Sequence, residues 1–373
     1  MELTRIIHPV GQGGFFSEKI KDGDQEINII YDCGGNSRQS IEEYLANYYL
    51  TSFPQEIDAV FISHLHDDHV NGLEYLLINS KVKYLFLPQL NHDQQMETYL
   101  YNIIYGRSKV ISNSFLQELY EHHYFQDTVV VEVPHSSSNQ VINKEINVHD
   151  DIDILSQNVK AFEPGTKIYY KKEWLFILYN PPVITKKLYS FYDSFKRSLN
   201  IKQEFELSEL PSIVEQYGID RCKAAYKRYF ESNHNAYSMA LLSTPSVHDN
   251  YNNDSCIKAD NSETNFIQSF LYMGDFETKL LYNDLKSYYQ PFWERINSLQ
   301  VPHHGSRNNY HPFLYEYPKT GFLCVGERNR YSHPNVDTLL GMKNMGCEPI
   351  LVTESLGTLR LLNFSDTSKG RLL

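Results

Sequence analysis

The sequence predicts an α/β fold, because short β-rich runs alternate with helical patterns along most of its 373 residues. Apolar side chains make up 41% of the chain and charged side chains 21%, which allows a sizeable core and argues against global disorder. A cluster of histidines and aspartates, His64–His69, follows directly after an apolar run. This order indicates that a buried strand delivers chemically active side chains to a sheet edge.

The first 90 or so residues alternate predicted strands with a predicted helix. Strands are predicted at Asn28–Tyr31, Ile57–Ile62 and Val82–Leu87, and a helix at Ser40–Leu50. Glycine turns separate these elements, and Pro88 ends the third strand. The alternation is the pattern expected of an α/β architecture.

Residues 91–235 are predicted to be largely helical. Helices are predicted at Met96–Tyr105, at Ser114–Phe125 and through most of Lys186–Phe230, with strands at Thr128–Val133 and Trp174–Tyr179. Lysines and arginines concentrate in the last helical stretch of a chain that is otherwise acidic. A solvated helical face explains this concentration, and a cap that attracts phosphate is the alternative.

After residue 235 the alternation of strands and turns returns. Strands are predicted at Tyr237–Leu242, Phe266–Met273 and Ser298–Pro302. The polar, asparagine-rich segment Ser246–Glu263 is predicted to be a loop.

Composition limits the possible functions. The formal net charge of −12 argues against a broad nucleic-acid-binding face. Five scattered cysteines without a CxxC pair predict reduced thiols rather than a disulfide framework. No signal peptide and no membrane span is expected, so the chain is predicted to be cytoplasmic.

The cluster at His64–His69 has the chemistry of a metal site. Neutral imidazoles and carboxylates are ligands that borderline divalent metals such as zinc accept. His64 and His66 are two residues apart, and Asp68 and His69 follow, so one loop can supply two adjacent metals. Histidines gathered by chance on a solvated loop are the alternative.

The same segment, His64-Leu65-His66-Asp67-Asp68-His69, resembles the HxHxDH signature of the metallo-β-lactamase-fold hydrolases. More narrowly, the chain resembles the soluble hydrolase domain of ComEC-type DNA-uptake proteins and their free-standing relatives. The segments similar to that family's VGQG, GD, HHGS and G-x-N-x-Y-x-HP motifs are Val10–Phe16 with Ile30–Gly34, then Leu271–Glu277, Val301–Ser306 and Val325–Pro334. All occur in the family's order.

The resemblance implies one domain over residues 1–373 with a four-layer αββα sandwich, in which the metals sit on loops at one end. It also implies that the largely helical residues 91–235 are an insertion. Such a cap would restrict the substrate or recruit a protein partner.

The resemblance further implies two divalent metal ions, zinc or manganese. His64 and His66 are expected to bind one ion, and Asp68 and His69 the other, with Asp275 bridging. His303 or His304 completes the second set. We favour His303, because it directly follows a strand-like segment, and expect His304 to contact substrate.

One expected ligand is missing. Wider members of the family carry a histidine in a PGH-type turn, and the equivalent turn here, Leu178–Pro182, has none. His234 is the nearest replacement, although a loop histidine without a ligand role is the alternative. His135 is a weaker candidate.

The resemblance assigns roles to further residues. Asp32 is expected to orient the HxHxDH loop by hydrogen bonds or, alternatively, to cap the turn at Gly34. His333 is expected to act as a general acid or to contact phosphate, and a surface turn is the alternative. Asp68, His304 and His333 are counted as catalytic. Ser306, Arg307, Arg328 and Arg330 are expected to bind substrate.

These expectations favour a metal-dependent hydrolase in which a metal-bound hydroxide attacks a phosphodiester. The substrate would be nucleic acid, as for a nuclease, or a nucleotide, as for a phosphodiesterase. Hydrolysis of a thioester, lactone or lactam is an alternative, because a fold does not fix its substrate. The second alternative is that the chain is a non-catalytic, metal-stabilised interaction module. No membrane association is expected.

Overall fold

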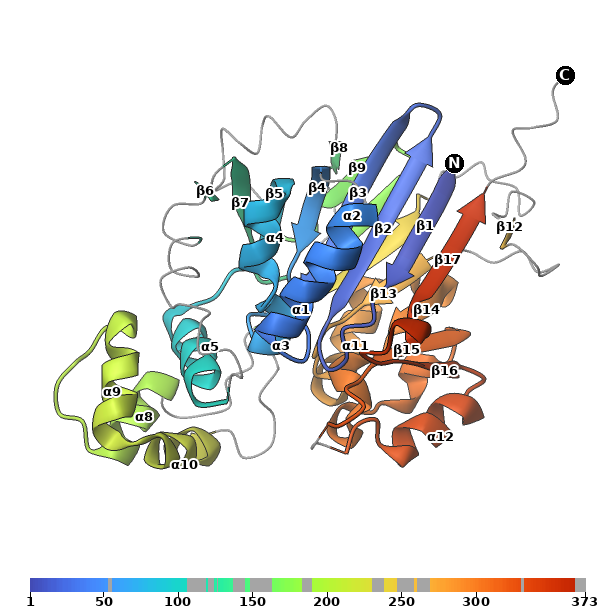
Figure 1. Cartoon of the computed structure of the whole chain (residues 1–373). Helices are drawn as coiled ribbons and strands as arrows, with labels where there is room; N and C mark the ends of the chain where they lie inside the picture. Colours follow the sequence, from blue (N-terminus) through green and yellow to red (C-terminus); the bar gives the residue numbers. More distant parts are fainter. Residues whose placement is uncertain are drawn as a thin grey trace, which may run out of the picture.

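Two β-sheets pack face to face, and helices cover their outer faces (Figure 1). The computed structural model describes residues 1–52, 56–105, 119, 124–125, 127–136, 145–147, 163–182, 190–229, 238–246, 258–259, 269–329 and 332–365. The predicted α/β fold with an αββα sandwich is confirmed by this layering.

Within the described residues, the first sheet has nine strands in the order β12-β17-β1-β2-β3-β4-β5-β7-β6. Their bounds are β1 Glu2–Ile7, β2 Phe15–Asp22, β3 Gln25–Cys33, β4 Glu56–Phe61, β5 Lys81–Pro88, β6 Tyr124–Phe125, β7 Thr128–Val133, β12 Lys258–Ala259 and β17 Arg360–Ser365. Strands β3, β4, β5 and β7 run parallel, so their carboxyl ends meet at one edge of the sheet.

The second sheet has eight strands among the residues described, in the order β16-β15-β14-β13-β11-β10-β9-β8. Their bounds are β8 Glu145–Asn147, β9 Lys167–Tyr170, β10 Trp174–Tyr179, β11 Ala240–Pro245, β13 Ser269–Tyr272, β14 Ile296–Gln300, β15 Thr320–Cys324 and β16 Glu348–Val352. Strands β13 to β16 are parallel, and they too end at a common edge.

Alternation along β3 shows how the sequence builds two cores from one strand. Ile27, Ile29 and Tyr31 belong to the apolar cluster that also contains residues of the second sheet, such as Trp174. Ile30 belongs instead to the cluster formed with the outer helices. Because successive side chains of a strand point to opposite faces, a run that is apolar at every position is expected in a sheet covered on both sides.

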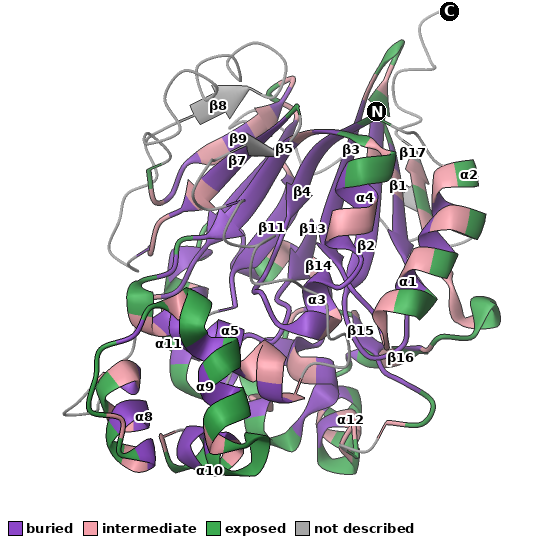
Figure 2. Ribbon diagram, turned by 60° about the vertical axis from the view of Figure 1, so that its left-hand side comes forward, coloured by how far each residue is buried: buried purple, intermediate pink, exposed green. Residues whose placement is uncertain are grey.

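The outer helices form two groups. Over the first sheet lie α1 Arg38–Tyr44, which continues through a π turn at Leu45–Tyr49 into α2 Leu50–Ser52, then α3 Asp67–Val70, α4 Leu73–Asn79 and α5 His92–Tyr105. The helices α8 Phe191–Leu199, α9 Leu210–Tyr217 and α10 Ile219–Tyr229 pack beside α5. The second sheet is covered by α11 Thr278–Tyr288 and α12 Val336–Asn344. Figure 2 shows the central strands almost wholly buried between these half-exposed helices, whereas β16 and β17 are largely intermediate or exposed.

Most predicted elements are confirmed, among them β4, β5, β7, β10 and α5. The predicted helix Ser114–Phe125 is wrong at its end, because Tyr124–Phe125 pairs with β7 as strand β6. Most of that segment, and most of the loop Ser246–Glu263, lies outside the described residues. The range 91–235 contains strands of both sheets as well as helices. None of the helices described here is long and apolar enough to cross a membrane.

Candidate metal centre

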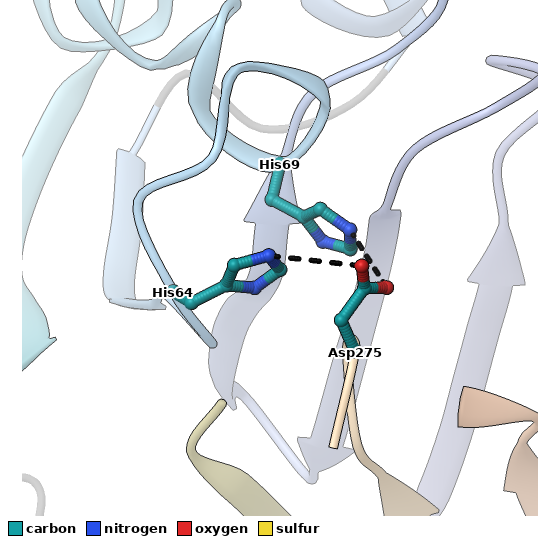
Figure 3. A group of neighbouring side chains, drawn as sticks. All are labelled: His64, His69 and Asp275. Atoms are coloured by element: carbon teal, nitrogen blue, oxygen red, sulfur yellow. Dashed lines mark ion pairs between the residues drawn. The ribbon is translucent and has the colours of Figure 1, made fainter. Parts of the chain in front are cut away.

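The predicted ligands come from loops at the carboxyl ends of parallel strands. The loop His64–His69 follows β4 and continues into α3, Asp275 follows β13, and His304 follows β14. Figure 3 shows the side chains of His64, His69 and Asp275 pointing toward one another. The two sheets thus bring together residues that lie more than two hundred positions apart in the chain.

The distances around Asp275 suit a shared cation. Asp275 Oδ1 lies 3.3 Å from Nε2 of His69 and 3.5 Å from Nε2 of His304. Nε2 of His304 also lies 3.4 Å from Oδ2 of Asp68. Two ligand atoms that are each about 2.0–2.2 Å from one tetrahedral ion are roughly 3.3–3.6 Å apart. These four side chains therefore lie at ligand spacing.

Among the described residues, two overlapping groups of three have ligand atoms within 4.8 Å of one another, namely His64–His69–Asp275 and Asp68–His69–His304. His64 is the looser member, with Nε2 at 3.9 Å from Asp275 Oδ2. The ring of His66 lies beside that of His64, with the centroids 4.6 Å apart.

Three buried imidazole nitrogens support the metal fit. The Nε2 atoms of His64, His69 and His304 have no hydrogen-bond partner among the described residues. A buried polar atom left without a partner costs about 1–3 kcal/mol. Three such atoms around carboxylates are accounted for if the residues hold one or two divalent cations.

The charges in the group are strongly coupled. Burial opposes ionisation of Asp275, but His303, His304 and His69 outweigh it and hold its pKa well below the usual value. Burial and the neighbouring His69 and His66 lower the pKa of His64 well below its usual value. An ionised carboxylate and a neutral imidazole are the forms that coordinate a metal, and Asp275 and His64 favour these forms. Against burial, neighbouring carboxylates raise the pKa of His69 and of His304, so a metal that binds there would displace their protons.

Asp32 orients the loop from beneath. Its backbone adopts the left-handed region with φ 57°, and its carboxylate accepts hydrogen bonds from Ser63 N at 2.7 Å and Ser63 Oγ at 2.9 Å. Nδ1 of His69 lies 2.8 Å from the same carboxylate. Gly34 leaves room for the loop, because a Cβ there would lie 2.3 Å from the Asp68 carbonyl oxygen.

The two histidines of the HHGS motif occupy different positions. Nδ1 of His304 lies 2.8 Å from the carbonyl oxygen of Cys324, which directs Nε2 into the ligand group. His303 Nδ1 lies 3.1 Å from the Asn309 amide, and its side chain is 28% exposed against 3% for His304. Sequence analysis favoured His303 as ligand; the structure groups His304 with Asp68 and His69 instead.

The other predicted residues are more dispersed. The ring of His333 lies 5.7 Å from that of His303, at the rim of the group. Ser306 is buried and its hydroxyl accepts from Asn308 N. Arg307 is exposed and pairs with Asp337 of α12.

Arg328 is exposed. Nδ1 of His135 lies 2.6 Å from the carbonyl oxygen of Pro181. Pro181 belongs to the turn in which the family's third imidazole was expected. His234 and Arg330 lie outside the described residues.

Sequence analysis did not single out the residues of α5 that contact this loop. Glu97, Tyr101 and Asn102 all approach His66 or its neighbours. Their helix was predicted correctly as Met96–Tyr105, but a glutamate in a helix is ordinarily exposed. The available signal was a charged residue between the apolar positions Met96 and Leu100, which by itself does not indicate burial.

Comparison with known proteins shows a partial similarity in the first half of the chain. Residues 19–159, which include the HxHxDH loop, match the family model described as anti-Pycsar protein Apyc1. An anti-Pycsar protein Apyc1 from Paenibacillus sp. (strain J14) is 35% identical over 77 residues, which is 19% of this chain and 29% of that protein. Its counterpart from Paenibacillus harenae is 34% identical over 89 residues, 22% of this chain and 34% of that protein. The matches therefore span about a third or less of either relative.

Solved structures are similar at low sequence identity. The metallo-β-lactamase fold protein YhfI from Bacillus subtilis is 10% identical with a TM-score of 0.41, over 97% of this chain and 100% of that one. Unliganded yeast PDE1 is 10% identical with a TM-score of 0.41, over 97% and 99% of the two chains. A long form RNase Z from yeast is 10% identical with a TM-score of 0.39, over 98% and 42%. The narrower resemblance to ComEC-type domains stays a prediction.

Proposed function

We propose that this chain is a metal-dependent hydrolase that cleaves a small phosphodiester of nucleotide type. The observation that carries the proposal is the convergence of buried imidazole Nε2 atoms on Asp275, at distances of 3.3 Å for His69 and 3.5 Å for His304. The similarity to anti-Pycsar protein Apyc1 over residues 19–159 includes the histidine loop and supports the hydrolase assignment.

In this proposal His64 and His66 would hold a first divalent cation, Asp68, His69 and His304 would hold a second, and Asp275 would be shared between them. Zinc or manganese bound there would lower the pKa of a water and neutralise charge on the phosphoryl oxygens. Asp32 keeps His69 in place through its contact with Nδ1.

Residues at the rim of the ligand group would contact the substrate and transfer a proton. His303 and His333 stand side by side there, with ring centroids 5.7 Å apart. Their position beside Asp275 suits hydrogen bonding to phosphoryl oxygens and transfer of a proton to the departing oxygen. Ser306 and Arg307 follow in the same loop, and Arg307 reaches substrate only if its ion pair with Asp337 opens.

Charge favours a small substrate over a polymer. The net charge of −12 opposes an extended contact with nucleic acid, whose binding depends on many phosphate contacts. A mononucleotide or dinucleotide brings one phosphodiester to the cations and little further negative charge, so its repulsion by the acidic surface is smaller.

A substrate panel tests the proposal. The full chain is freed of metal, reloaded with zinc or manganese, and assayed on cyclic mononucleotides, dinucleotides, bis-p-nitrophenyl phosphate, single-stranded DNA, nitrocefin and a thioester. We expect turnover that depends on metal and is faster on the small nucleotides than on DNA.

The other outcomes point elsewhere. Turnover of nitrocefin or the thioester alone would establish the lactam or thioester alternative. Tight metal binding without turnover of any substrate would indicate a non-catalytic module. A chain that binds neither zinc nor manganese would end the proposal.

A further inference from the structure

Three residues of helix α5 contact the metal-ligand loop at or beside His66. The ring of Tyr101 stacks on the imidazole of His66, with centroids 3.8 Å apart and planes inclined by 16°. Asn102 binds the backbone on either side of His66, since its Nδ2 donates to Leu65 O at 2.7 Å and its Oδ1 accepts from Asp67 N at 3.1 Å. The plane of the ring and the path of its loop are therefore both set by one helix.

A third contact comes from a buried carboxylate. Glu97 Oε1 lies 3.9 Å from Nε2 of His66, and the side chains are 2% and 4% exposed. The hydroxyl of Tyr226, in α10, donates a hydrogen bond to the same oxygen. A buried carboxylate needs nearby donors, and the Tyr226 hydroxyl is one.

The position of Glu97 bears on which ring nitrogen of His66 carries the proton. Glu97 lies on the Nε2 side of the ring, and a carboxylate there favours the tautomer that carries its proton on Nε2. The lone pair is then on Nδ1, the other ring nitrogen. Histidines that bind a metal through one nitrogen commonly donate the other N–H to a carboxylate, and this partner raises ligand basicity and fixes the ring.

Resting on the metal centre proposed above, we propose that Glu97 and Tyr226 are a positioning pair for His66. In this proposal the pair lies against the Nε2 side of the ring, 3.9 Å away at Glu97 Oε1, and leaves Nδ1 available for the first cation, while Tyr101 stacks on the ring and Asn102 binds the loop backbone. Helices α5 and α10 would thereby strengthen the first cation site, for which the sequence lacks the usual third imidazole. Its role would then be to build the centre and not only to cover it.

The test measures metal binding directly. The full chain is prepared metal-free as wild type, Glu97→Gln and Tyr226→Phe, and each is titrated with Co²⁺, whose visible absorption reports ligand geometry. Glu215→Gln on exposed α9 and Tyr229→Phe on α10 are matched controls. Thermal unfolding of the metal-free proteins establishes that each variant is folded.

We expect Glu97→Gln to weaken one of two bound ions by about 10–100-fold, to leave the other unchanged, and to alter the Co²⁺ spectrum. Tyr226→Phe should act in the same direction, and the controls should match wild type. A folded Glu97→Gln protein with wild-type affinities and spectrum would overturn the positioning pair.

Three further outcomes complete the test and keep the inference separate from the proposed function. If Glu97→Gln does not fold, unchanged metal affinity in Tyr226→Phe overturns the pair. A wild-type chain that binds no Co²⁺, zinc or manganese overturns the proposed function together with the pair. Two ions and full turnover in both wild type and Glu97→Gln overturn the pair alone.

Discussion

The carboxylate of Asp32 lies 2.8 Å from Nδ1 of His69, and both side chains are fully buried. Asp32 is the penultimate residue of β3, and His69 lies in α3, which follows the neighbouring parallel strand β4, so this contact joins the end of one strand to the helix after the next. Burial opposes the charge on His69, but Asp32, Asp68 and Asp275 outweigh it and raise its pKa well above the usual value. Asp32 thus acts on the centre through His69 and without lying among the ligand atoms.

Asp32→Asn should weaken metal binding by about 10–100-fold, because the amide cannot accept from Ser63 and His69 as the carboxylate does. Metal affinity measured by competition with a chelator checks this, with exposed Asp193→Asn on α8 as the control. Unchanged affinity in folded Asp32→Asn would show that the contact serves only the turn at Gly34.

The neighbours His303 and His304 should behave differently when each is replaced by alanine. His304→Ala should bind one ion fewer, because Nε2 of His304 lies 3.4 Å from Asp68. His303→Ala should keep both ions but lose about 10²–10⁴-fold in turnover if its ring moves a proton. Metal content and rate are measured on the same preparations, and the reverse pattern would return the ligand role to His303.

Asp275→Ala should lower phosphodiester turnover by at least about 10³-fold, because Asp275 Oδ1 lies 3.3 Å from Nε2 of His69 and 3.5 Å from Nε2 of His304. Rates at saturating zinc or manganese check this, with Asp220→Ala on α10 as an exposed control. Turnover within a few-fold of wild type would remove Asp275 from the centre.

The buried side chain of His8 predicts that the folded chain loses stability in acid. It is fully buried between the Tyr44 hydroxyl and Ser17, and burial lowers its pKa to about 3. The unfolded chain protonates this histidine below about pH 6.5 while the folded chain does not, so stability falls as pH drops toward 3. We expect a loss of about 2 kcal/mol between pH 7 and pH 5.

His8→Gln should remove this dependence. Urea unfolding of the metal-free proteins at pH 7 and pH 5 measures it, since wild type should lose about 2 kcal/mol more than the variant. Equal losses would mean that His8 is protonated in the folded chain, or that other groups carry the sensitivity.

The sequence by itself predicted the α/β class, and its resemblance to the metallo-β-lactamase-fold hydrolases implied the layered fold and the candidate ligands. That resemblance rests on short motifs, namely the apolar run before His64–His69, with Gly274-Asp275 and His303-His304 downstream. These features are local: strand patterns repeat every two residues, and ligands follow strand ends, so neither requires knowledge of distant contacts.

Only the tertiary structure showed which of His303 and His304 points into the ligand group and that Glu97 lies beside the ligand loop. His303 and His304 both have left-handed backbones, with φ 48° and 52°, and it is the contacts with Asn309 and Cys324 that direct their rings apart. Glu97 is an ordinary helical glutamate in the sequence and becomes buried only where α10 packs on α5. Such burial depends on segments that are distant in the chain, so a local sequence pattern does not predict it.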